Sequence, residues 1–499
     1  MSKDKSTAFF GHPMGLFTLF TTEMWERFNY YGMRALLTIF LTAELVTGGF
    51  GLDENEALAI YGLFTALVYL TPMIGGILAD RILGQRKSIY IGALTMATGQ
   101  LFLAYSASMG PEVLEMKKTL FFIGLGVLVC GNGFFKPNIS TMVGDLYDPK
   151  DVRRDGAFTI FYMGINIGAT LGPMIAGPLG EKIAWQYGFL AASVAMLIGF
   201  FWFLFSHSAL GTTGMPPKYN REKTRLMKRD VFDIAIYYLS VVALVAGMIF
   251  GWKVTPSVLR TILVILVAAA GVGYLSFSIG KNTHGKTEWS RVGVILILAF
   301  ANIFFWSGYE QAGGTFSLFA RDNIDRVVGS FEIPVSLFQT INAIFIVLFA
   351  PVFTLLWLKL DNVKLNPNTP MKFGWGMLLL SIGFFIMAYA NDLTQGGAVK
   401  ISPLWLVLVY LMHTWGELCL SPIGLSMVTK LSPPKLVSTM MGIWMGSFAL
   451  ANYLAASFKS IMEKFDLPMF WFIAGETLVA AIVLMLISPF LNKMMKGIK

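Results

Sequence analysis

Residues 14–44 read MGLFTLFTTEMWERFNYYGMRALLTIFLTAE, a long apolar stretch that carries a few charges. A helix needs about 20 residues to cross a bilayer core, so this stretch is long enough to span one. Similar stretches recur along the chain and predict an all-α integral membrane protein with about fourteen transmembrane helices. The expected spans are 14–44, 55–79, 87–108, 117–143, 156–180, 184–206, 231–251, 257–279, 291–319, 333–358, 371–391, 402–429, 435–462 and 468–492.

The composition supports this class and excludes others. Of the 499 residues, 56% are hydrophobic and 13% are charged, whereas soluble domains carry about 25% charged residues. The same apolar excess excludes a disordered chain. Cys130 and Cys419 lie inside apolar runs, so they predict neither a disulfide framework nor a metal site. We expect the first apolar run to be retained rather than cleaved as a signal peptide, because charges interrupt it.

The basic residues follow membrane topology. If the N-terminus is placed inside, 25 of the 38 Lys and Arg residues fall in connections on the side that holds both ends. Connections on the cytoplasmic side carry such an excess. The pattern predicts cytoplasmic termini, and it accounts for the net charge of +9 without a nucleic-acid partner.

The longest polar connection, at about 207–230, is basic and divides six spans from the rest. Two weakly charged spans follow it as a hairpin, and six more complete the chain. Two six-helix halves with an inserted pair are typical of a transporter. The predicted domains are an N-terminal bundle at 1–206, a linker with the inserted hairpin at 207–290, and a C-terminal bundle at 291–499.

Charged residues inside spans are candidates for function, because each costs about 2.5 to 3.5 kcal/mol at a helix centre. On the first span the charged and tyrosine residues share one helical face, with Glu23 and Arg27 at ion-pairing spacing. The deep charges are three cations and four carboxylates, or five carboxylates if Glu476 on the last span is included: Arg27, Arg34, Lys136, Glu23, Glu26, Glu310 and Glu417. Each alone also fits a structural ion pair or a place nearer the interface. Together they leave a carboxylate without a compensating cation, which favours proton binding.

Neutral polar and aromatic residues on other spans could complete a cavity: Tyr69, Asn166, Trp306, Asn342, Trp444, Ser447 and Asn452. Taken singly, each also fits ordinary packing. Acidic and basic groups in one aromatic-lined cavity would suit a zwitterionic ligand. On the fifth span, Gly164, Gly168 and Gly172 recur at every fourth residue and predict close packing on a neighbouring helix.

Two motifs are specific enough to suggest a family. Residues 23–32, EMWERFNYYG, match the pattern E-x-x-E-R-F-x-Y-Y-G, and residues 134–140 read FFKPNIS. Both resemble signatures of the proton-dependent oligopeptide transporters of the major facilitator superfamily. Further similar stretches lie at 75–86, 166–168, 306–311, 339–342 and 417–422. The resemblance therefore runs over nearly the whole chain.

The resemblance implies the major facilitator fold and symport of di- and tripeptides with protons by alternating access. We also expect a plasma-membrane location, function as a monomer and no cofactor beyond the coupling proton. A broad cavity would be expected to accept peptide-like drugs as well. The second span lacks a histidine, and the connection between the eleventh and twelfth spans has only about ten residues. Both features, with the inserted hairpin, resemble bacterial members of the family.

Roles for individual residues follow from the same resemblance. Proton coupling is assigned to Glu23, Glu26, Arg27 and Glu310. The peptide carboxylate is assigned to Arg27, Arg34 and Lys136, and the peptide amino end to Asn166, Asn342 and Glu417. Contacts with the peptide backbone and side chains are assigned to Tyr30, Tyr31, Tyr69, Trp306, Trp444 and Ser447. Two gating salt bridges are implied, Arg34 with Glu310 and Lys136 with Glu417.

Other readings of the chain are weaker. A carrier of nitrate or another small anion with the same fold would need neither Glu417 nor the amine-binding asparagines. A membrane enzyme would usually show a sizeable extramembrane domain, and the connections here are short. Residues 280–287 fit the phosphate-loop pattern G-x-x-x-x-G-K-[ST], but no strand precedes them, so we expect no nucleotide site. His413 and Glu417 share a helix face without a third ligand, so we expect no metal site.

Overall fold

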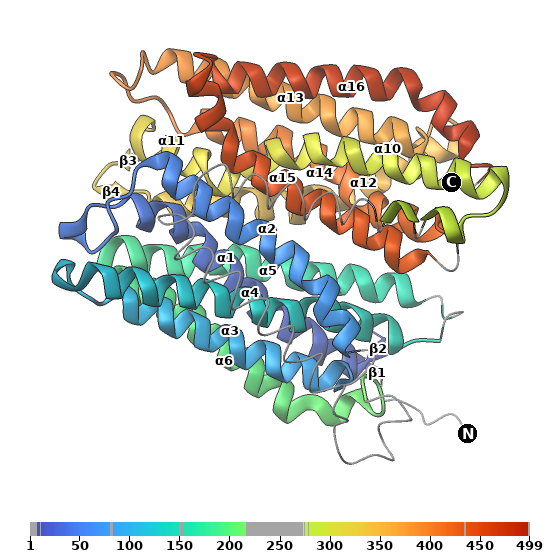
Figure 1. The fold of residues 1–499 in the computed structure, drawn as a ribbon, viewed down its shortest axis with the longest axis horizontal. Helices are drawn as coiled ribbons and strands as arrows, with labels where there is room; N and C mark the ends of the chain where they lie inside the picture. The colour runs from blue at the N-terminus through green and yellow to red at the C-terminus, as the bar shows by residue number, and fades with distance from the viewer. Residues whose placement is uncertain are drawn as a thin grey trace. The chain divides into compact units, whose positions relative to one another are not determined.

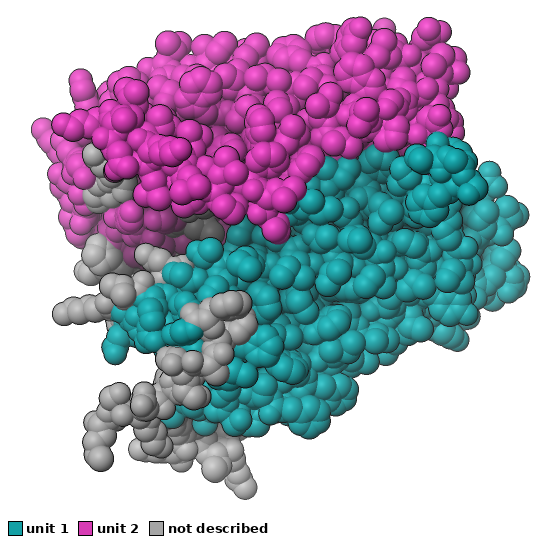
Figure 2. Space-filling model, turned by 180° about the vertical axis from the view of Figure 1, so that it is seen from behind, with its two compact units in different colours: residues 1–249, 327–344 teal, residues 250–326, 345–499 magenta. Residues whose placement is uncertain are grey.

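The computed structural model describes residues 7–9, 11–79, 83–148, 151, 153–215, 273, 275–277, 279–433 and 436–497. The chain forms two compact units (Figure 2). Unit 1 comprises Met1–Ile249 and Val327–Ile344, and unit 2 comprises Phe250–Arg326 and Phe345–Lys499. The predicted span 231–251 and most of 257–279 lie outside the described residues, so the inserted hairpin, the count of fourteen helices and the domain boundaries stay predictions.

Unit 1 is built from long helices (Figure 1). Their bounds are α1 Met14–Thr42, α2 Glu54–Leu78, α3 Gln85–Ala107, α4 Leu114–Asp145, α5 Arg153–Pro178 and α6 Trp185–Ser206. Short elements accompany them: β1 Thr7–Phe9, β2 His12–Pro13, η1 Leu45–Thr47, η3 Pro111–Val113, η4 Leu179–Ile183, η5 His207–Leu210, β3 Val327–Val328, β4 Phe331–Glu332 and η7 Val335–Gln339. Helix α12, Thr340–Asn362, begins in unit 1 and continues into unit 2.

Glycines let the helices of unit 1 approach closely. Helix α1 packs on α5, and α3 packs on α4. A Cβ atom at Gly168 would lie 2.2 Å from the carbonyl oxygen of Met24, and one at Gly172 would lie 2.6 Å from that of Phe28. Any larger residue would therefore separate the two helices. The predicted close packing of the fifth span is confirmed.

Unit 2 contains α10 Gly285–Tyr309, η6 Glu310–Gly313, α11 Thr315–Asn323, α13 Thr369–Leu393, α14 Leu404–Leu431, α15 Val437–Lys464 and α16 Met469–Met494. Helix α13 packs on α14 and α16, and α10 packs on α15 (Figure 1). The sequence predicts one continuous helix over 291–319, but α10 ends at Tyr309 and a 3-10 turn follows it. Glu310 thus lies where α10 ends.

Helix termini follow local capping chemistry. The Asp53 side chain accepts a hydrogen bond from the Glu56 amide at the start of α2, and Asn368 accepts one from the Met371 amide at the start of α13. Such caps satisfy amides that have no partner inside the helix.

Seven helical segments among the described residues are long and apolar enough to cross a membrane. They are Gly156–Ile183, Trp185–Leu210, Gly285–Asn323, Val335–Asn362, Thr369–Leu393, Leu404–Leu431 and Met469–Met494. Helix α1 is also long, at 29 residues, but it carries Glu23, Glu26, Arg27 and Arg34, all of them buried. The protein is therefore an all-helical membrane protein, as predicted.

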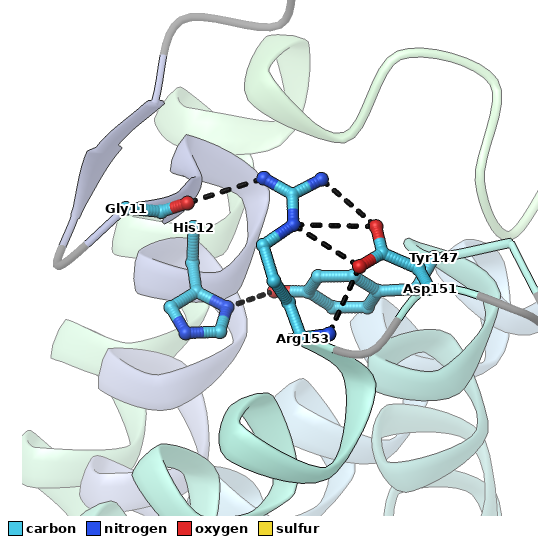
Figure 3. A network of polar contacts seen from close by, with 5 residues as sticks. All are labelled: Gly11, His12, Tyr147, Asp151 and Arg153. Carbon is cyan, nitrogen blue, oxygen red and sulfur yellow. Dashed lines mark hydrogen bonds and ion pairs between the residues drawn. The ribbon is translucent and has the colours of Figure 1, made fainter.

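A polar network ties the segment before α1 to the connection between α4 and α5 (Figure 3). The Tyr147 hydroxyl lies 2.8 Å from Nδ1 of His12. Arg153 forms an ion pair with Asp151 at 2.8 Å and donates to the carbonyl oxygen of Gly11 at 3.2 Å. Burial raises the pKa of Tyr147 to about 12. Hydrogen bonds from the Arg153 side chain and backbone lower the pKa of Asp151 to about 2.

A second polar contact fastens residues 327–344 to the rest of unit 1. The Glu181 carboxylate accepts hydrogen bonds from the backbone amides of Val335 at 2.8 Å and Ser336 at 2.9 Å. Lys182 forms an ion pair with Glu332 on β4. These contacts explain why a segment that lies between two parts of unit 2 in the sequence belongs to unit 1.

Candidate functional site

The charges of α1 form a buried cluster in unit 1. The Nε atom of Arg27 lies 3.0 Å from Oε1 of Glu23 and 2.5 Å from Oε2 of Glu26. Their exposed fractions are 5% for Arg27, 3% for Glu23 and 0% for Glu26. Two buried carboxylates thus share one guanidinium, so this cluster carries a net negative charge when all three groups are ionised.

Asn132 on α4 joins this cluster, although no sequence motif singled it out. Its Nδ2 atom donates to Oε1 of Glu26 at 3.4 Å. Asn132 lies one helical turn before Lys136, so it shares a face of α4 with a predicted binding residue. That spacing was the signal that could have found it.

Arg34 lies two turns further along α1, among tyrosine rings. Its Nε atom donates to the hydroxyl of Tyr61 at 2.6 Å. The guanidinium carbon lies 5.8 Å from the ring centroids of both Tyr31 and Tyr61. The rings of Tyr30 and Tyr31 meet edge to face, with centroids 5.2 Å apart. Sequence reasoning missed Tyr61 because a lone tyrosine on the second span carries no motif.

Lys136, the third predicted cation, lies on α4 beside α2. Its Nζ atom is 4.4 Å from the ring centroid of Tyr69. The side-chain amide of Asn166 on α5 is buried and donates to the carbonyl oxygen of Tyr162 at 2.9 Å. Asn342, in the first turn of α12, also belongs to unit 1 and is half-buried. The guanidinium carbon of Arg27 lies 5.7 Å from the Tyr30 ring centroid, so all three predicted cations of unit 1 lie beside aromatic rings. Cations of this kind suit an anion such as a carboxylate.

The predicted residues of unit 2 are organised around Glu417 on α14. The hydroxyl of Tyr309, the last residue of α10, donates a hydrogen bond to Oε2 of Glu417. Glu417 is 8% exposed. The Tyr309 ring stacks on Phe305, with centroids 5.7 Å apart. A buried carboxylate suits a cationic group such as an ammonium.

Trp306 lies about one helical turn before Tyr309 and has a hydrogen-bonded partner of its own. Its Nε1 atom donates to Oδ1 of Asn302 at 3.0 Å, and Nδ2 of Asn302 donates to the hydroxyl of Ser447 at 2.9 Å. Ser447 in turn donates to the carbonyl oxygen of Trp444 at 2.6 Å. Asn302 was not among the predicted residues, although it lies four positions before Trp306 on the same face of α10.

The structure also places Glu310 and Trp444, the other predicted site residues of unit 2. Glu310 is 3% exposed in unit 2, and Trp444 is 1% exposed there. The predicted pairs, Arg34 with Glu310 and Lys136 with Glu417, each join residues of different units and stay predictions, as do the assigned roles. Within the described part of the chain, no group of three His, Cys, Asp or Glu side chains is placed to hold a metal ion.

Comparison with known proteins gives consistent matches. A profile described as "PTR2: POT family" matches residues 86–474. The chain is 39% identical over 496 residues to the "Peptide transporter YePEPT" of Yersinia enterocolitica, covering 96% of this chain and 95% of that protein. It is 32% identical over 513 residues to a "Di-/tripeptide transporter" of Lactococcus lactis subsp. lactis, covering 100% and 99%. A crystal structure of "peptide transporter POT in complex with sulfate" matches with a TM-score of 0.85 and 35% identity, covering 99% of this chain and 100% of that one.

Proposed function

Because this chain belongs to the POT family, we propose that it is a proton-coupled symporter that imports di- and tripeptides by alternating access. The family resemblance predicted from the sequence is confirmed, and the chain is a transporter rather than an enzyme. Relatives that match it along almost their whole length are described as peptide and di-/tripeptide transporters, which supports the peptide substrate.

The observation that carries the proposal is the distribution of charged side chains over the two units, of which Arg27, Arg34 and Glu417 are buried and Lys136 is half-buried. Unit 1 contributes the cations Arg27, Arg34 and Lys136, and unit 2 contributes the Glu417 carboxylate beside Tyr309. A peptide is a zwitterion, so its carboxylate would bind the first set and its ammonium the second. Asn166 and Asn342 would add hydrogen-bond acceptors at the amino end.

Proton coupling would use the cluster on α1, with Glu310 as a further protonatable group. Arg27 holds both Glu23 and Glu26, so protonation of one carboxylate leaves a neutral ion pair behind. Loss of that proton restores a net negative cluster, which competes with the peptide carboxylate for the guanidinium. Binding of proton and peptide would therefore favour one another, as symport requires.

The remaining assignments belong to the same proposal. Tyr30, Tyr31, Tyr69, Trp306, Trp444 and Ser447 would contact the peptide backbone and side chains. The Arg34–Glu310 and Lys136–Glu417 pairs would gate access to it. The protein would act as a monomer in the plasma membrane, with fourteen helices and cytoplasmic termini, and the proton would be its only coupling ion.

Uptake of a labelled dipeptide into liposomes that contain the purified protein tests the proposal. We expect accumulation under an inward proton gradient, loss of accumulation with an uncoupler, and weaker uptake by Glu417→Ala. Nitrate should not compete with the peptide. No uptake of any small peptide by folded protein, together with nitrate uptake, would overturn the substrate assignment in favour of an anion carrier.

A further inference from the structure

Asn302 is a fully buried amide in α10 that the proposed peptide contacts do not include; its exposed fraction is 0%. Its carbonyl oxygen accepts from the indole of Trp306, and its amino group donates to Ser447. The indole N–H can only donate, so the amide oxygen must face it and the orientation of the amide is fixed. Ser447 then donates its own proton to the Trp444 carbonyl oxygen, so the hydrogen bonds run continuously from Trp306 through Asn302 and Ser447 to Trp444.

This chain of hydrogen bonds holds the indole plane of Trp306 in one place. The Trp306 ring centroid lies 4.9 Å from that of Tyr309 and 4.9 Å from that of Phe448. Tyr309 in turn donates to Glu417. Asn302 therefore fixes the ring that packs directly against the partner of the proposed ammonium-binding carboxylate.

Packing alone would not require an amide at this position. A leucine has about the same size and would bury no polar atoms in the interior of a membrane protein. Loss of the amide would leave the Trp306 N–H without its acceptor, and a buried donor without a partner is unfavourable. The indole would then turn toward another acceptor.

We propose that Asn302 is a positioning residue that sets the orientation of Trp306 and, through it, the affinity of the transporter for peptides. This inference rests on the proposed peptide-transport function for its effect on KM. The claim that Asn302 orients the Trp306 indole does not depend on which substrate the protein transports.

A double-mutant cycle tests the proposal in the full-length protein reconstituted in liposomes. The variants are Asn302→Leu, Trp306→Phe and the two combined, with uptake of Ala-Phe measured for each. Phenylalanine has no N–H group, so in Trp306→Phe the hydrogen bond from residue 306 to Asn302 is absent. We expect Asn302→Leu to raise KM about tenfold with kcat changed less than twofold. In the Trp306→Phe background, the same change should alter KM less than twofold. Should Asn302→Leu fold poorly, Asn302→Ala removes the same two hydrogen bonds.

The matched control is Asn29→Leu. Asn29 is also a buried asparagine in a long helix, and its side chain donates to the carbonyl oxygen of Ala192 in unit 1. The Asn29→Leu variant should have a lower melting temperature than the parent and an unchanged KM. An unchanged KM in Asn302→Leu would overturn the inference. So would a tenfold rise in KM on Asn302→Leu in both the parent and the Trp306→Phe background.

Fluorescence separates failure of this inference from failure of the proposed function. Subtracting the emission spectrum of Trp306→Phe from that of the parent gives the emission spectrum of Trp306. Subtracting the spectrum of the double variant from that of Asn302→Leu gives the emission spectrum of Trp306 when the Asn302 amide is absent. We expect the second difference spectrum to shift to shorter wavelength, because the indole loses its hydrogen bond. Identical difference spectra would overturn the inference even if peptide uptake were normal. A shifted spectrum in a protein that takes up no peptide would support the positioning role and overturn the proposed function alone.

Discussion

Tyr309 on α10 donates a hydrogen bond to the Glu417 carboxylate on α14, so the end of one helix fixes the predicted ammonium-binding group of another. A hydrogen bond to a charged group contributes about 1.5 to 3 kcal/mol. The orientation of Glu417 therefore depends on a residue that the sequence motif contains but that the resemblance does not place in contact with peptide.

Tyr309→Phe should weaken peptide binding while keeping the ring in place. We expect the KM for a dipeptide to rise about tenfold or more, because Glu417 loses the donor that holds it. Concentration-dependent uptake in liposomes measures the change. Tyr453→Phe is the control, since Tyr453 is 53% exposed on α15 and should leave KM unchanged. An equal KM for the parent and Tyr309→Phe would show that this hydrogen bond does not support binding.

Gly168→Ala should separate α1 from α5. The added Cβ atom would lie 2.2 Å from the Met24 carbonyl oxygen and 2.7 Å from Cβ of Arg27, so the helix that carries the charge cluster must shift. Overpacking of this kind costs about 1 to 3 kcal/mol. We expect a lower melting temperature in detergent and a loss of proton-driven uptake.

Gly446→Ala on α15 is the matched control, because a Cβ atom there would meet nothing within 4 Å. It should melt like the parent, or slightly higher, since alanine favours a helix. Equal melting temperatures for Gly168→Ala and Gly446→Ala would contradict the close approach of α1 and α5.

The network in Figure 3 predicts a dependence of stability on alkaline pH. The pKa of Tyr147 is raised to about 12 by burial, from about 10 in an unfolded chain. A group with a raised pKa contributes its full stability below the unfolded value and loses it as the pH rises through the folded value. The parent should therefore lose stability between about pH 10 and 12 partly because Tyr147 ionises.

Comparison with Tyr147→Phe isolates this effect from the other tyrosines. The variant lacks the His12 hydrogen bond and should melt lower than the parent at pH 8. Because it cannot ionise at this position, the difference in melting temperature should shrink as the pH approaches 12. A difference that stays constant over this range would contradict the assignment to Tyr147.

On the acid side, the contribution of Asp151 to stability should persist down to about pH 4 and disappear as the pH falls through about 2.

The membrane class and the charge cluster were predictable from the sequence for a physical reason. Long apolar stretches have few alternatives to a transmembrane helix. The fixed helical period places residues four apart, such as Glu23 and Arg27, on one face of any helix that contains them. The motifs then identified the family, which the comparisons confirm.

Features that depend on contacts between helices were harder to predict from the sequence. The predicted span 291–319 ran through the end of α10 at Tyr309, so Glu310 was expected inside a helix. The polar and glycine residues at 310–314 were the signal of a break, but they do not specify where the helix ends. Asn132, Tyr61 and Asn302 reach the charged or aromatic groups of the site through side-chain hydrogen bonds. Such bonds depend on how helices pack, which periodicity within one helix does not specify.

The central claim is that the buried cluster on α1 couples peptide movement to protons. Its most direct test is Glu23→Gln in liposomes, with dipeptide accumulation under a proton gradient and gradient-free exchange measured on the same preparation. Glu463→Gln is the control, because the Glu463 side chain is 53% exposed at the end of α15. The account predicts that Glu23→Gln exchanges peptide across the membrane but no longer accumulates it, while Glu463→Gln does both. Accumulation by Glu23→Gln at the parental level would contradict the account.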